Sequence, residues 1–434
     1  MDEPPKRSRR PRLSVRGLMI VVLLMGVGLG WVVPARIQRD AVAAIKASGG
    51  RAIYDWEWDL KKGPIDRGAP WAPGWLVDLV GVDHFGSVIL VNLNDRSDDT
   101  VMAHLGRLTK LDGLDASNTP RVTNAGVAHL RGLSRLTQLN LGTSGATGAC
   151  LVDLAGLTSL QGLYLDELPI DDVDLAHLSG LTDLETLNLN GTRVGDAGLA
   201  RLGPLTKLQH LQMMRTQIKG EGLAKLAGMD HLWLLFLGGS PLTSLSAIPP
   251  LPALTMLSVP QTPIGDAGLA GIERLSSLQV LCLTDTSVTD AGLERLKPMK
   301  TLTNLILSRT GVSSAGASAI AGLPALTGLS LDETRMTDEG LADLAKCPKL
   351  THLGLAKTSV TNAGLDRLAS LIGLVRLDVA ETGVTDAGLI RFRQNRPNLK
   401  ITNEVQGDVS QARDALAAAQ DAATRPTNPP GNAP

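Results

Sequence analysis

A sequence repeat of about 24 residues occurs thirteen times between residues 88 and 401, and this repetition restricts the fold more than any other feature of the chain. Successive copies begin 22 to 25 residues apart, most often 24. Their first residues are Val88, Leu111, Leu136, Leu160, Leu184, Leu208, Leu232, Leu254, Leu278, Leu302, Leu326, Leu350 and Leu374. So regular a register predicts a solenoid, in which each copy packs against the copies before and after it.

Within one copy the apolar spacing changes from that of a strand to that of a helix. In the copy that begins at residue 278, Leu281 and Leu283 alternate as on one side of a short strand. Leu293 and Leu296 then follow a helical spacing. Thr289 and Asp290 precede them, where such side chains can accept bonds from the free amides of a helix start and the acid favours the positive end of the helix dipole. One strand and one short helix cannot bury their apolar side alone, so the copies are expected to stack.

These copies resemble the leucine-rich-repeat family, whose strand signature is L-x-x-L-x-L-x-x-N/C, over about three-quarters of the chain. The Thr-Asp-Ala-Gly-Leu segment at 289–293 is similar to the cysteine-containing subclass found in F-box adaptors. The whole layout resembles membrane-anchored repeat proteins of planctomycete-type bacteria. The family implies an α/β horseshoe, with a parallel sheet on the concave face and short helices on the convex face. Such surfaces usually bind other macromolecules.

Threonine occupies the position that the family usually gives to asparagine or cysteine. The threonines are Thr192, Thr216, Thr262, Thr286, Thr310, Thr334, Thr358 and Thr382. Because a hydroxyl offers fewer hydrogen bonds than an amide, we expect the turns after the strands to be held differently from the usual asparagine ladder.

The N-terminal segment predicts a membrane anchor. Residues 17–35 are uncharged and separate Arg16 from Arg36, about the length that crosses a bilayer. Residues 1–16 carry six cations and two acids, a net charge of +4, which predicts a cytoplasmic tail. The chain is therefore expected to cross the cytoplasmic (inner) membrane once, with the repeats on the extracytoplasmic side. The alternative is a signal peptide cleaved near 33–35, which would leave a secreted protein.

Residues 36–87 predict a juxtamembrane helix and a cap for the first copy. The helix covers 36–48 and ends at Gly49-Gly50. From Tyr54 to Asp59 aromatic and acidic residues alternate, as in a strand with two unlike faces. Four of the six tryptophans stand before the repeats, namely Trp56, Trp58, Trp71 and Trp75. A cap over the open first coil explains this density, since an uncovered end would expose core.

No arrangement of residues predicts catalysis. The acids Asp55, Glu57 and Asp59 could bind a cation, but a solvated strand face is the commoner explanation. The same helix position of neighbouring copies holds His104, His129, Asp153 and His177. Helices packed 8–10 Å apart would keep most of these side chains from sharing one metal ion. We therefore expect no enzyme activity, no cofactor and no small-molecule substrate.

Charge and cysteine content restrict the partners further. A net charge of −1 provides no basic field for nucleic acid. Three cysteines are too few and too scattered for a disulfide framework. The expected partners are therefore a protein or peptide ligand and the membrane, through residues 17–35.

The outward positions of the predicted strands change in character along the horseshoe. They are mostly small or polar at both ends and apolar in the middle. The predicted partner-binding residues, which we call the concave patch, are His210, Met214, Leu234, Phe236, Met256, Val280, Cys282 and Ile306. Soluble proteins seldom expose apolar patches of this size to solvent, and Met and aromatic side chains are favoured at protein interfaces. The alternative is that β-propensity alone recruits these residues.

Because the patch should be exposed, replacing Phe236 and Ile306 by Ser is expected to change stability by no more than about 1 kcal/mol. The copy behind the patch is irregular. Its segment 238–252 is two residues short and carries prolines at 241, 249, 250 and 252, so no regular helix is expected there. Chance drift and functional bending both remain open as its cause.

At the C-terminal end, Phe392, Leu399 and Ile401 are expected to close the last copy. Residues 402–434 predict an Ala-rich helix and a disordered Pro-rich tail.

Two functions are compatible with these features. The first is a non-catalytic, membrane-anchored recognition scaffold that binds a protein or peptide through its concave face. The alternative is a structural component of the cell envelope that organises its neighbours or binds cell-wall glycan. Only Tyr164, beside Asp166 and Asn188, suggests a glycan site, whereas a patch of aliphatic and Met side chains favours a protein.

Overall fold

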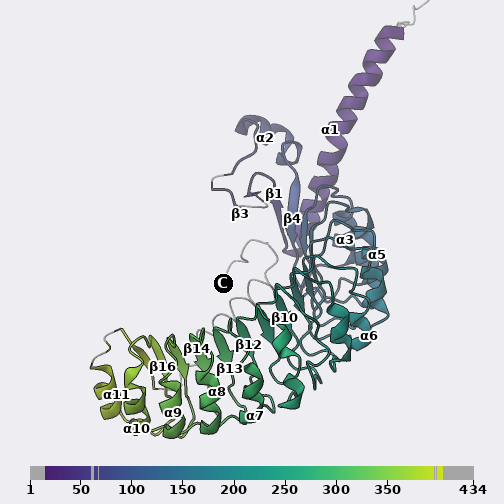
Figure 1. Ribbon diagram of the computed structural model, residues 1–434. Coiled ribbons are helices and arrows are strands. Elements are labelled where there is room, and N and C mark those ends of the chain that lie inside the picture. Colours follow the sequence, from purple (N-terminus) through teal and green to yellow (C-terminus); the bar gives the residue numbers. More distant parts are fainter. Residues whose placement is uncertain (1–14, 60–62, 67, 395, 397, 404–434) are drawn as a thin grey trace, which may run out of the picture.

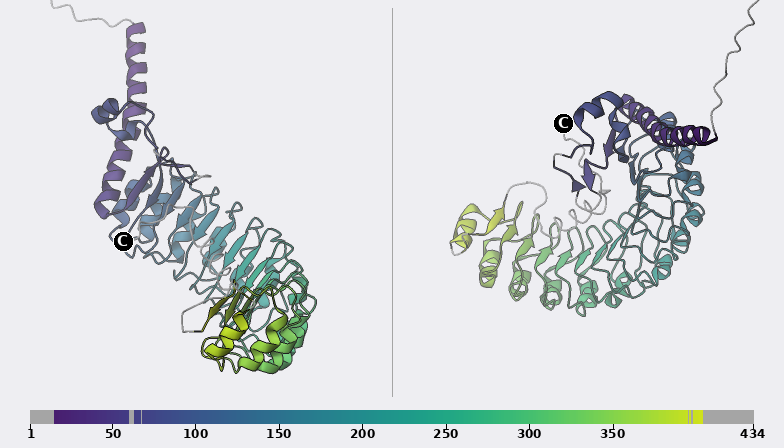
Figure 2. Two further views of the ribbon diagram at one scale, coloured as in Figure 1. Left: turned by 90° about the vertical axis from the view of Figure 1, so that its left-hand side faces the viewer. Right: turned by 90° about the horizontal axis from the view of Figure 1, so that it is seen from above.

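The computed structural model describes residues 15–59, 63–66, 68–394, 396 and 398–403, with side chains from Gly30 onward. The chain forms a curved solenoid with strands along its concave side and short helices outside (Figures 1 and 2). The predicted basic tail up to residue 14, and the predicted Ala-rich helix and Pro-rich tail from residue 404, lie outside the described residues.

One sheet of 15 strands runs the length of the solenoid in the order β1, β4, β5 and so on to β17. Its parallel strands are β4 (Val88–Asn92), β5 (Gly113–Asp115), β6 (Gln138–Asn140), β7 (Gly162–Tyr164), β8 (Thr186–Asn188), β9 (His210–Gln212), β10 (Leu234–Phe236), β11 (Met256–Ser258), β12 (Val280–Cys282), β13 (Asn304–Ile306), β14 (Gly328–Ser330), β15 (His352–Gly354), β16 (Arg376–Asp378) and β17 (Lys400–Thr402). The register repeats from copy to copy, so that Leu235 pairs with Leu211 and with Leu257. The predicted horseshoe with a concave parallel sheet is confirmed.

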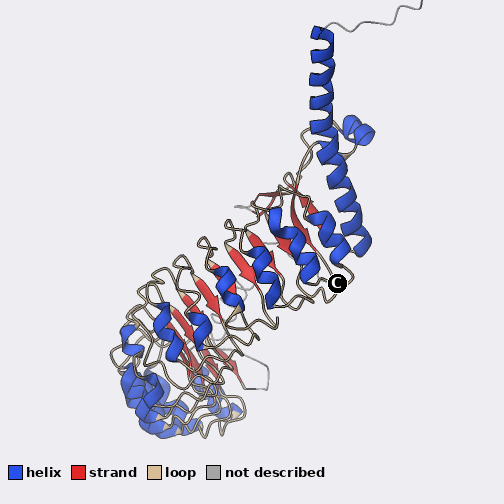
Figure 3. Ribbon diagram, turned by 90° about the vertical axis from the view of Figure 1, so that its right-hand side faces the viewer, coloured by secondary structure: helices blue, strands red, loops and turns tan. Residues whose placement is uncertain are grey.

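The convex side carries α-helices of at most eight residues and 3-10 turns (Figure 3). The α-helices are α3 (Asp99–Leu105), α4 (Asn124–Ala128), α5 (Leu151–Leu154), α6 (Asp196–Leu199), α7 (Asp290–Leu293), α8 (Ala317–Ala321), α9 (Asp338–Leu344), α10 (Asn362–Arg367) and α11 (Asp386–Arg393). The 3-10 turns are η2 (His129–Gly132), η3 (Gly148–Cys150), η4 (Asp174–Leu178), η5 (Glu221–Leu226), η6 (Ala267–Leu269), η7 (Ile272–Arg274), η8 (Glu294–Leu296), η9 (Ser314–Gly316) and η10 (Leu368–Ser370). All residues between β10 and β11 are described, and they form neither an α-helix nor a 3-10 turn. The prolines of this segment predict that absence.

The inward leucines form one continuous core. Leu187 and Leu281 are fully buried, and the core extends from the end of α1 to Leu399. Phe392 is also buried, and Ile401 packs against the core at the last strand. The irregular copy contributes as well, through Leu242, Leu245, Ile248 and Leu251. The core is therefore continuous even where the convex helix is missing.

Threonine hydroxyls hold the turns after the strands. Thr286 Oγ1 donates a hydrogen bond to the carbonyl of Leu283 at 2.7 Å, and the preceding residue, Asp285, has a φ of 58°. The other threonines of this column donate in the same way at 2.6–2.8 Å. The expectation that these turns are held without an asparagine ladder is confirmed.

A second set of hydrogen bonds joins one copy to the next through the acid of the Thr-Asp-Ala-Gly-Leu segment. Asp290 accepts from the backbone amide of Ser313 at 2.7 Å and from its hydroxyl at 2.6 Å. Asp99, Asp266 and Asp338 bond the following copy similarly. The expectation that side chains of this segment bond the start of their own helix is confirmed for the threonine in several copies, since Thr337 accepts from the amide of Glu339 and Thr361 from that of Ala363. It is corrected for the acid, because this carboxylate bonds the next copy.

The glycine of the same segment makes room for this bond. A Cβ on Gly292 would lie 2.5 Å from a carboxylate oxygen of Asp266, and one on Gly316 would lie 2.4 Å from Asp290. Contacts this short would force the carboxylate to move. The segment therefore needs glycine because the acid of the preceding copy passes directly beside it.

The first copy is covered by the end of the N-terminal helix. Helix α1 (Val15–Ser48) contains Pro34 and ends before Gly49, whose φ is 88°. Ala41 and Ile45 of α1 are fully buried and belong to the same core as the repeats. Gln38 fixes the helix to the first copy, since its Oε1 accepts from the amide of Val88 at 2.9 Å, and to the cap, since its Nε2 donates to the carbonyl of Gly86 at 3.0 Å.

The cap itself differs from the sequence prediction. Strand β1 (Arg51–Tyr54) pairs antiparallel with β4, and β2 (Trp58–Asp59) pairs with β3 (Gly63–Pro64). The strand predicted from Tyr54 to Asp59 is therefore interrupted by a turn, in which Trp56 stacks on Tyr54 with ring centroids 4.4 Å apart. Burial and the hydrogen bond to Asp83 raise the pKa of Tyr54. Helix α2 (Gly74–Val80) and the 3-10 turn η1 (Val82–His84) complete the cap.

In the described part of the chain, no helix is both long and apolar enough to span a membrane. The predicted anchor, residues 17–35, falls within α1, but the side chains of residues 17–29 lie outside the described ones. The anchor therefore stays a prediction.

Candidate functional site

The concave patch lies on five adjacent strands, β9 to β13. Side chains alternate along β10, so that Leu235 joins the main core while Leu234 and Phe236 belong to a separate cluster. Leu234 pairs with Met256, which pairs with Val280 on the next strand. We call Leu234, Phe236, Met256 and Val280 the concave cluster, against which Met214 and Trp233 pack. The structure therefore brings the central predicted residues together on the face opposite to the core.

The expectation that these side chains are exposed is wrong. Leu234, Phe236 and Ile306 have no exposed surface, and Met256, Val280 and Cys282 are also buried. Leu234, Phe236, Met256 and Val280 pack on one another, and Trp233 and Met214 pack beside them. Only His210 and Met214 are half-buried. Replacing Phe236 and Ile306 by Ser must then disturb packing, whereas the partner-binding role of the patch stays a prediction.

His210 forms one end of the site. Its Nδ1 lies 2.8 Å from the hydroxyl of Thr186, and its ring meets that of Trp233 edge to face at 4.6 Å between centroids. Burial lowers the pKa of His210 below its ordinary value of 6.5. Burial therefore favours the neutral imidazole over the charged form.

Two buried polar atoms flank Phe236 on the neighbouring strands. Gln212 on β9 and Ser258 on β11 stand in register with Phe236. Among the described residues, Gln212 Nε2 and Ser258 Oγ have no hydrogen-bond partner. The other amide atom of Gln212, Oε1, accepts from Asn190 at 3.1 Å, which fixes the direction of its NH₂ group. Because an unpaired buried donor costs about 1–3 kcal/mol, these two atoms are the polar groups of the site that would gain most from a hydrogen bond with a ligand.

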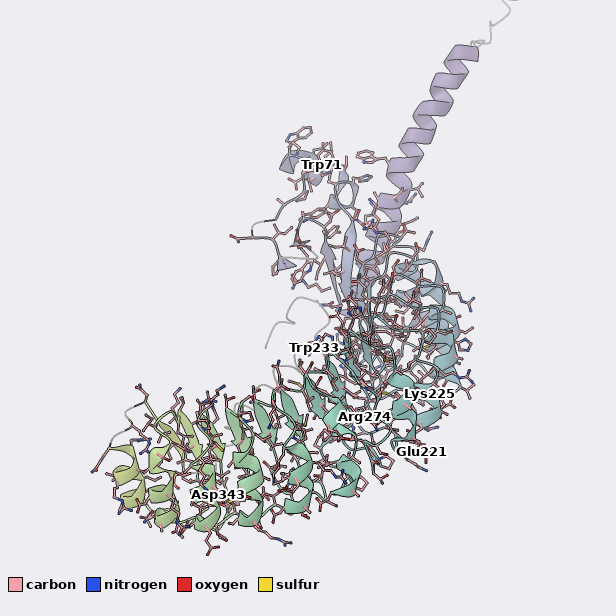
Figure 4. The ribbon with its side chains drawn as sticks, in the orientation of Figure 1. Trp71, Glu221, Lys225, Trp233, Arg274 and Asp343 are labelled. Atoms are coloured by element: carbon pink, nitrogen blue, oxygen red, sulfur yellow. The ribbon has the colours of Figure 1, made fainter. Side chains whose placement is uncertain are left out.

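Sequence reasoning missed Trp233, Gln212 and Ser258. Trp233 follows the first leucine of its copy, a position that was not counted among the outward ones, yet Figure 4 shows it on the concave side of the solenoid. Trp233 is the one tryptophan within the repeats, and this could have marked it. For Gln212 and Ser258 no sequence signal exists, because their missing partners depend on the neighbouring strands.

The suggested glycan site is not an open surface. Tyr164 is buried, and this burial raises its pKa to about 12. Asn188 donates to Asp166 at 3.2 Å, so these two side chains satisfy each other. Burial also raises the pKa of Asp166. A sugar ring would find no exposed aromatic face at this position.

Other candidate groups have structural partners. Asp153, which shares the column of His104, His129 and His177, forms an ion pair with Arg131. Within the described residues, no three His, Cys, Asp or Glu side chains are placed to hold a metal ion. The three cysteines are buried and unpaired, and Cys282, expected to face the open concave side, lies 3.4 Å from the hydroxyl of Thr284. Burial raises the pKa of Cys150 to about 12 and that of Cys347 to about 11.

Comparison with known proteins agrees with this architecture. Residues 180–203 and 205–227 match the family model described as leucine rich repeat. The fold is that of a leucine-rich-repeat protein. An internalin of Listeria monocytogenes is 21% identical, over 76% of this chain and 93% of that chain, with a TM-score of 0.59. A chain of the mouse RP105/MD-1 complex is 20% identical, over 72% of this chain and 54% of that chain, with a TM-score of 0.53. No curated protein matches the chain.

Proposed function

We propose that the chain is a non-catalytic recognition scaffold that binds a protein or peptide through strands β9 to β13. Leucine-rich-repeat proteins generally act as binding scaffolds rather than as enzymes. The observation that supports this site most directly is the pair of buried polar atoms, Gln212 Nε2 and Ser258 Oγ, which have no partner among the described residues. The mouse structure named above is itself a complex of two proteins.

A polypeptide fits this arrangement because it supplies both kinds of contact. A backbone carbonyl can accept from Gln212 Nε2, and a backbone amide or carbonyl can bond Ser258 Oγ. Apolar side chains of the same ligand can pack on Trp233, which is half-buried at the edge of the concave cluster. A glycan would need exposed aromatic faces, and Tyr164 is buried. The chemistry of the site therefore favours a protein or peptide over a sugar.

A photo-crosslinking amino acid at position 233 tests this site in the full-length chain, expressed in its native cells. The matched control is position 375, which occupies the same place in the copy that begins at residue 374 and is exposed. We expect one protein species crosslinked from position 233 and absent from position 375. A crosslink from position 233 to residues 404–434 would instead identify the chain itself as the occupant and contradict the proposal. Equal labelling from both positions would also contradict it.

We further propose that residues 17–35 anchor the scaffold in the cytoplasmic membrane, with the N-terminus inside and the repeats outside. The support is the uncharged run between Arg16 and Arg36 and the net positive charge before it. The same layout supports the resemblance to membrane-anchored repeat proteins of planctomycete-type bacteria.

Topology can be measured with a reporter fused to residue 434. Activity of a periplasmic reporter supports the anchor orientation, and activity of a cytoplasmic reporter contradicts it. The mass of the mature protein separates the anchor from a cleaved signal peptide, because only the anchor retains residues 1–35.

A further inference from the structure

Two of the four tryptophans predicted to cap the first copy do not cap it. Trp58 is buried and Trp56 packs against the core, as a cap requires. Trp71 and Trp75, however, are 78% and 69% exposed. Large exposed indoles are unusual on a soluble surface, so these two require another explanation.

Helix α2 presents an unpartnered apolar side. Trp75 and Leu79 are four residues apart and therefore lie on the same side of the helix. Leu79 is 74% exposed, and no residue of α2 is buried. The helix also carries the exposed Asp78 next to Leu79. Such a helix gains by contact with an apolar phase.

The same surface continues onto α1 where that helix leaves the cap. Trp31, Val32 and Val33 are each almost half exposed. Phe85 joins the two regions, since its ring centroid lies 6.2 Å from that of Trp31 and 5.3 Å from that of Trp71. Trp31 and Trp71 also line one cavity of about 880 Å³ between α1 and the cap. The exposed apolar residues of the two helices are therefore neighbours.

Helix α2 lies where the surface of a membrane would be if α1 crossed that membrane. Figure 1 shows α2 beside the part of α1 that projects from the solenoid, and Figure 4 places Trp71 on this side of the cap. Trp31 to Val33 form the last part of the apolar run that begins at residue 17. Tryptophan is enriched where a membrane helix meets the polar headgroups, because its ring is apolar and its N–H can bond water or lipid.

We propose that Trp71, Trp75 and Leu79, together with Trp31 to Val33, form a membrane-contact surface that inserts into the outer interface of the bilayer. The proposal rests on the proposed anchor and adds a second attachment to it. A single helix would leave the solenoid free to tilt. Contact through α2 fixes the orientation of the horseshoe relative to the membrane, so that its concave face has a defined direction.

The test uses the full-length chain with Leu79→Cys carrying an environment-sensitive fluorophore, in vesicles of phosphatidylethanolamine and phosphatidylglycerol. The three native cysteines are buried and so leave position 79 as the accessible thiol. The matched control is Ile390→Cys on α11, at the other end of the solenoid, where the native side chain is likewise exposed. Lipids with a spin label near the headgroup should quench the fluorophore at position 79 several-fold more than the one at position 390.

The outcomes separate this proposal from that of the anchor. If the chain floats with the vesicles but position 79 is quenched no more than position 390, the contact surface is wrong and the anchor stands. If the chain does not float with them, the anchor fails and the contact surface fails with it. A fluorophore at position 79 that is shielded from water but not quenched by the labelled lipid would place a second copy on α2, which also overturns the proposal.

Discussion

The concave cluster and the membrane-contact surface are both rich in apolar side chains, but they differ in burial. Phe236 has no exposed surface, whereas Trp75, of similar bulk, is 69% exposed. Phe236 packs in one cluster with Leu234, Met256 and Val280, which come from its own strand and from the next two strands. Trp75 stands on a helix of two turns that no other described element buries. Apolar residues are therefore buried in one region and left exposed in the other.

This difference in burial shows that apolar side chains have different roles in the two regions. In the concave cluster the apolar side chains contribute to stability, and the proposed partner contacts are made by the half-buried edge and by Gln212 and Ser258. On α2 the apolar side chains contribute little to stability and are free to contact another phase. Burial, rather than composition, decides which role an apolar residue can have.

The largest expected effect is that of Phe236→Ala. Removing a fully buried ring loses its transfer energy and leaves a cavity, so we expect the free energy of unfolding to fall by about 3–5 kcal/mol. Urea denaturation of the full-length chain, followed by circular dichroism, measures this. A loss below about 1 kcal/mol would mean that the ring is exposed in solution, as an open patch requires.

Leu281→Ala provides the reference for a residue of the main core. It is fully buried and packs in the same core as Leu187, so we expect a loss of about 2–5 kcal/mol in the same urea experiment. Comparable losses for Leu281→Ala and Phe236→Ala would show that the concave cluster is as well packed as the core. If Leu281→Ala costs less than about 1 kcal/mol, the register of the repeats is wrong.

Much of the fold could be predicted from the sequence because the repeat supplies the same information many times. The alternation of apolar residues at Leu281 and Leu283 predicts a strand, the side of that strand that faces the core, and the parallel register. The absence of a convex helix between β10 and β11 could also be predicted, because proline has no backbone N–H to donate to a helical hydrogen bond. Local rules are sufficient wherever each copy contacts only its neighbours.

The site could be predicted only in part, because burial depends on what lies around a residue in space. The sequence placed Phe236 on the correct face and gave it the wrong exposure. It attributed Trp71 and Trp75 to a cap, since nothing local distinguishes them from Trp56 and Trp58. The role of Asp290 between copies also depends on a neighbour 23 residues away, Ser313, which no local rule includes.

Gln212→Leu tests the unpaired amide at the concave centre. If Gln212 Nε2 has no partner in the free protein, replacing the side chain by an apolar one of similar size removes a desolvation cost. We expect stability to change little or to increase by about 1 kcal/mol, after allowing for the lost bond to Asn190. Asn190→Ala, which also removes the acceptor of the Met214 amide, gives an upper limit for the cost of losing that bond. A loss above about 3 kcal/mol for Gln212→Leu alone would show that the amide is already satisfied.

His210 should make stability depend on pH. Because burial lowers its pKa in the folded chain, the folded state binds the proton less readily than the unfolded state. Stability is therefore complete above the unfolded pKa of about 6.5 and decreases as the pH falls below it. His210→Gln keeps a hydrogen-bonding side chain and should make this decrease in stability shallower. The measurement is urea denaturation at pH values from about 7.5 to about 5, a range that includes the ordinary histidine pKa of about 6.5. An unchanged slope would mean that His210 is solvated.

The smallest expected effect is that of Trp75→Ser on folding. The indole is exposed, so its loss should change the free energy of unfolding of the full-length chain in detergent micelles by less than about 0.5 kcal/mol. Trp58→Ser is the matched control, because that buried tryptophan packs beside Ile53 and Leu90 and should cost several kcal/mol, about 3–5. In vesicles, Trp75→Ser should still reduce the lipid quenching measured at position 79, since the ring that holds α2 at the interface is gone. A stability loss near that of Trp58→Ser would show that Trp75 is packed within the protein, and the distinction between a covered and an open apolar region would then no longer hold.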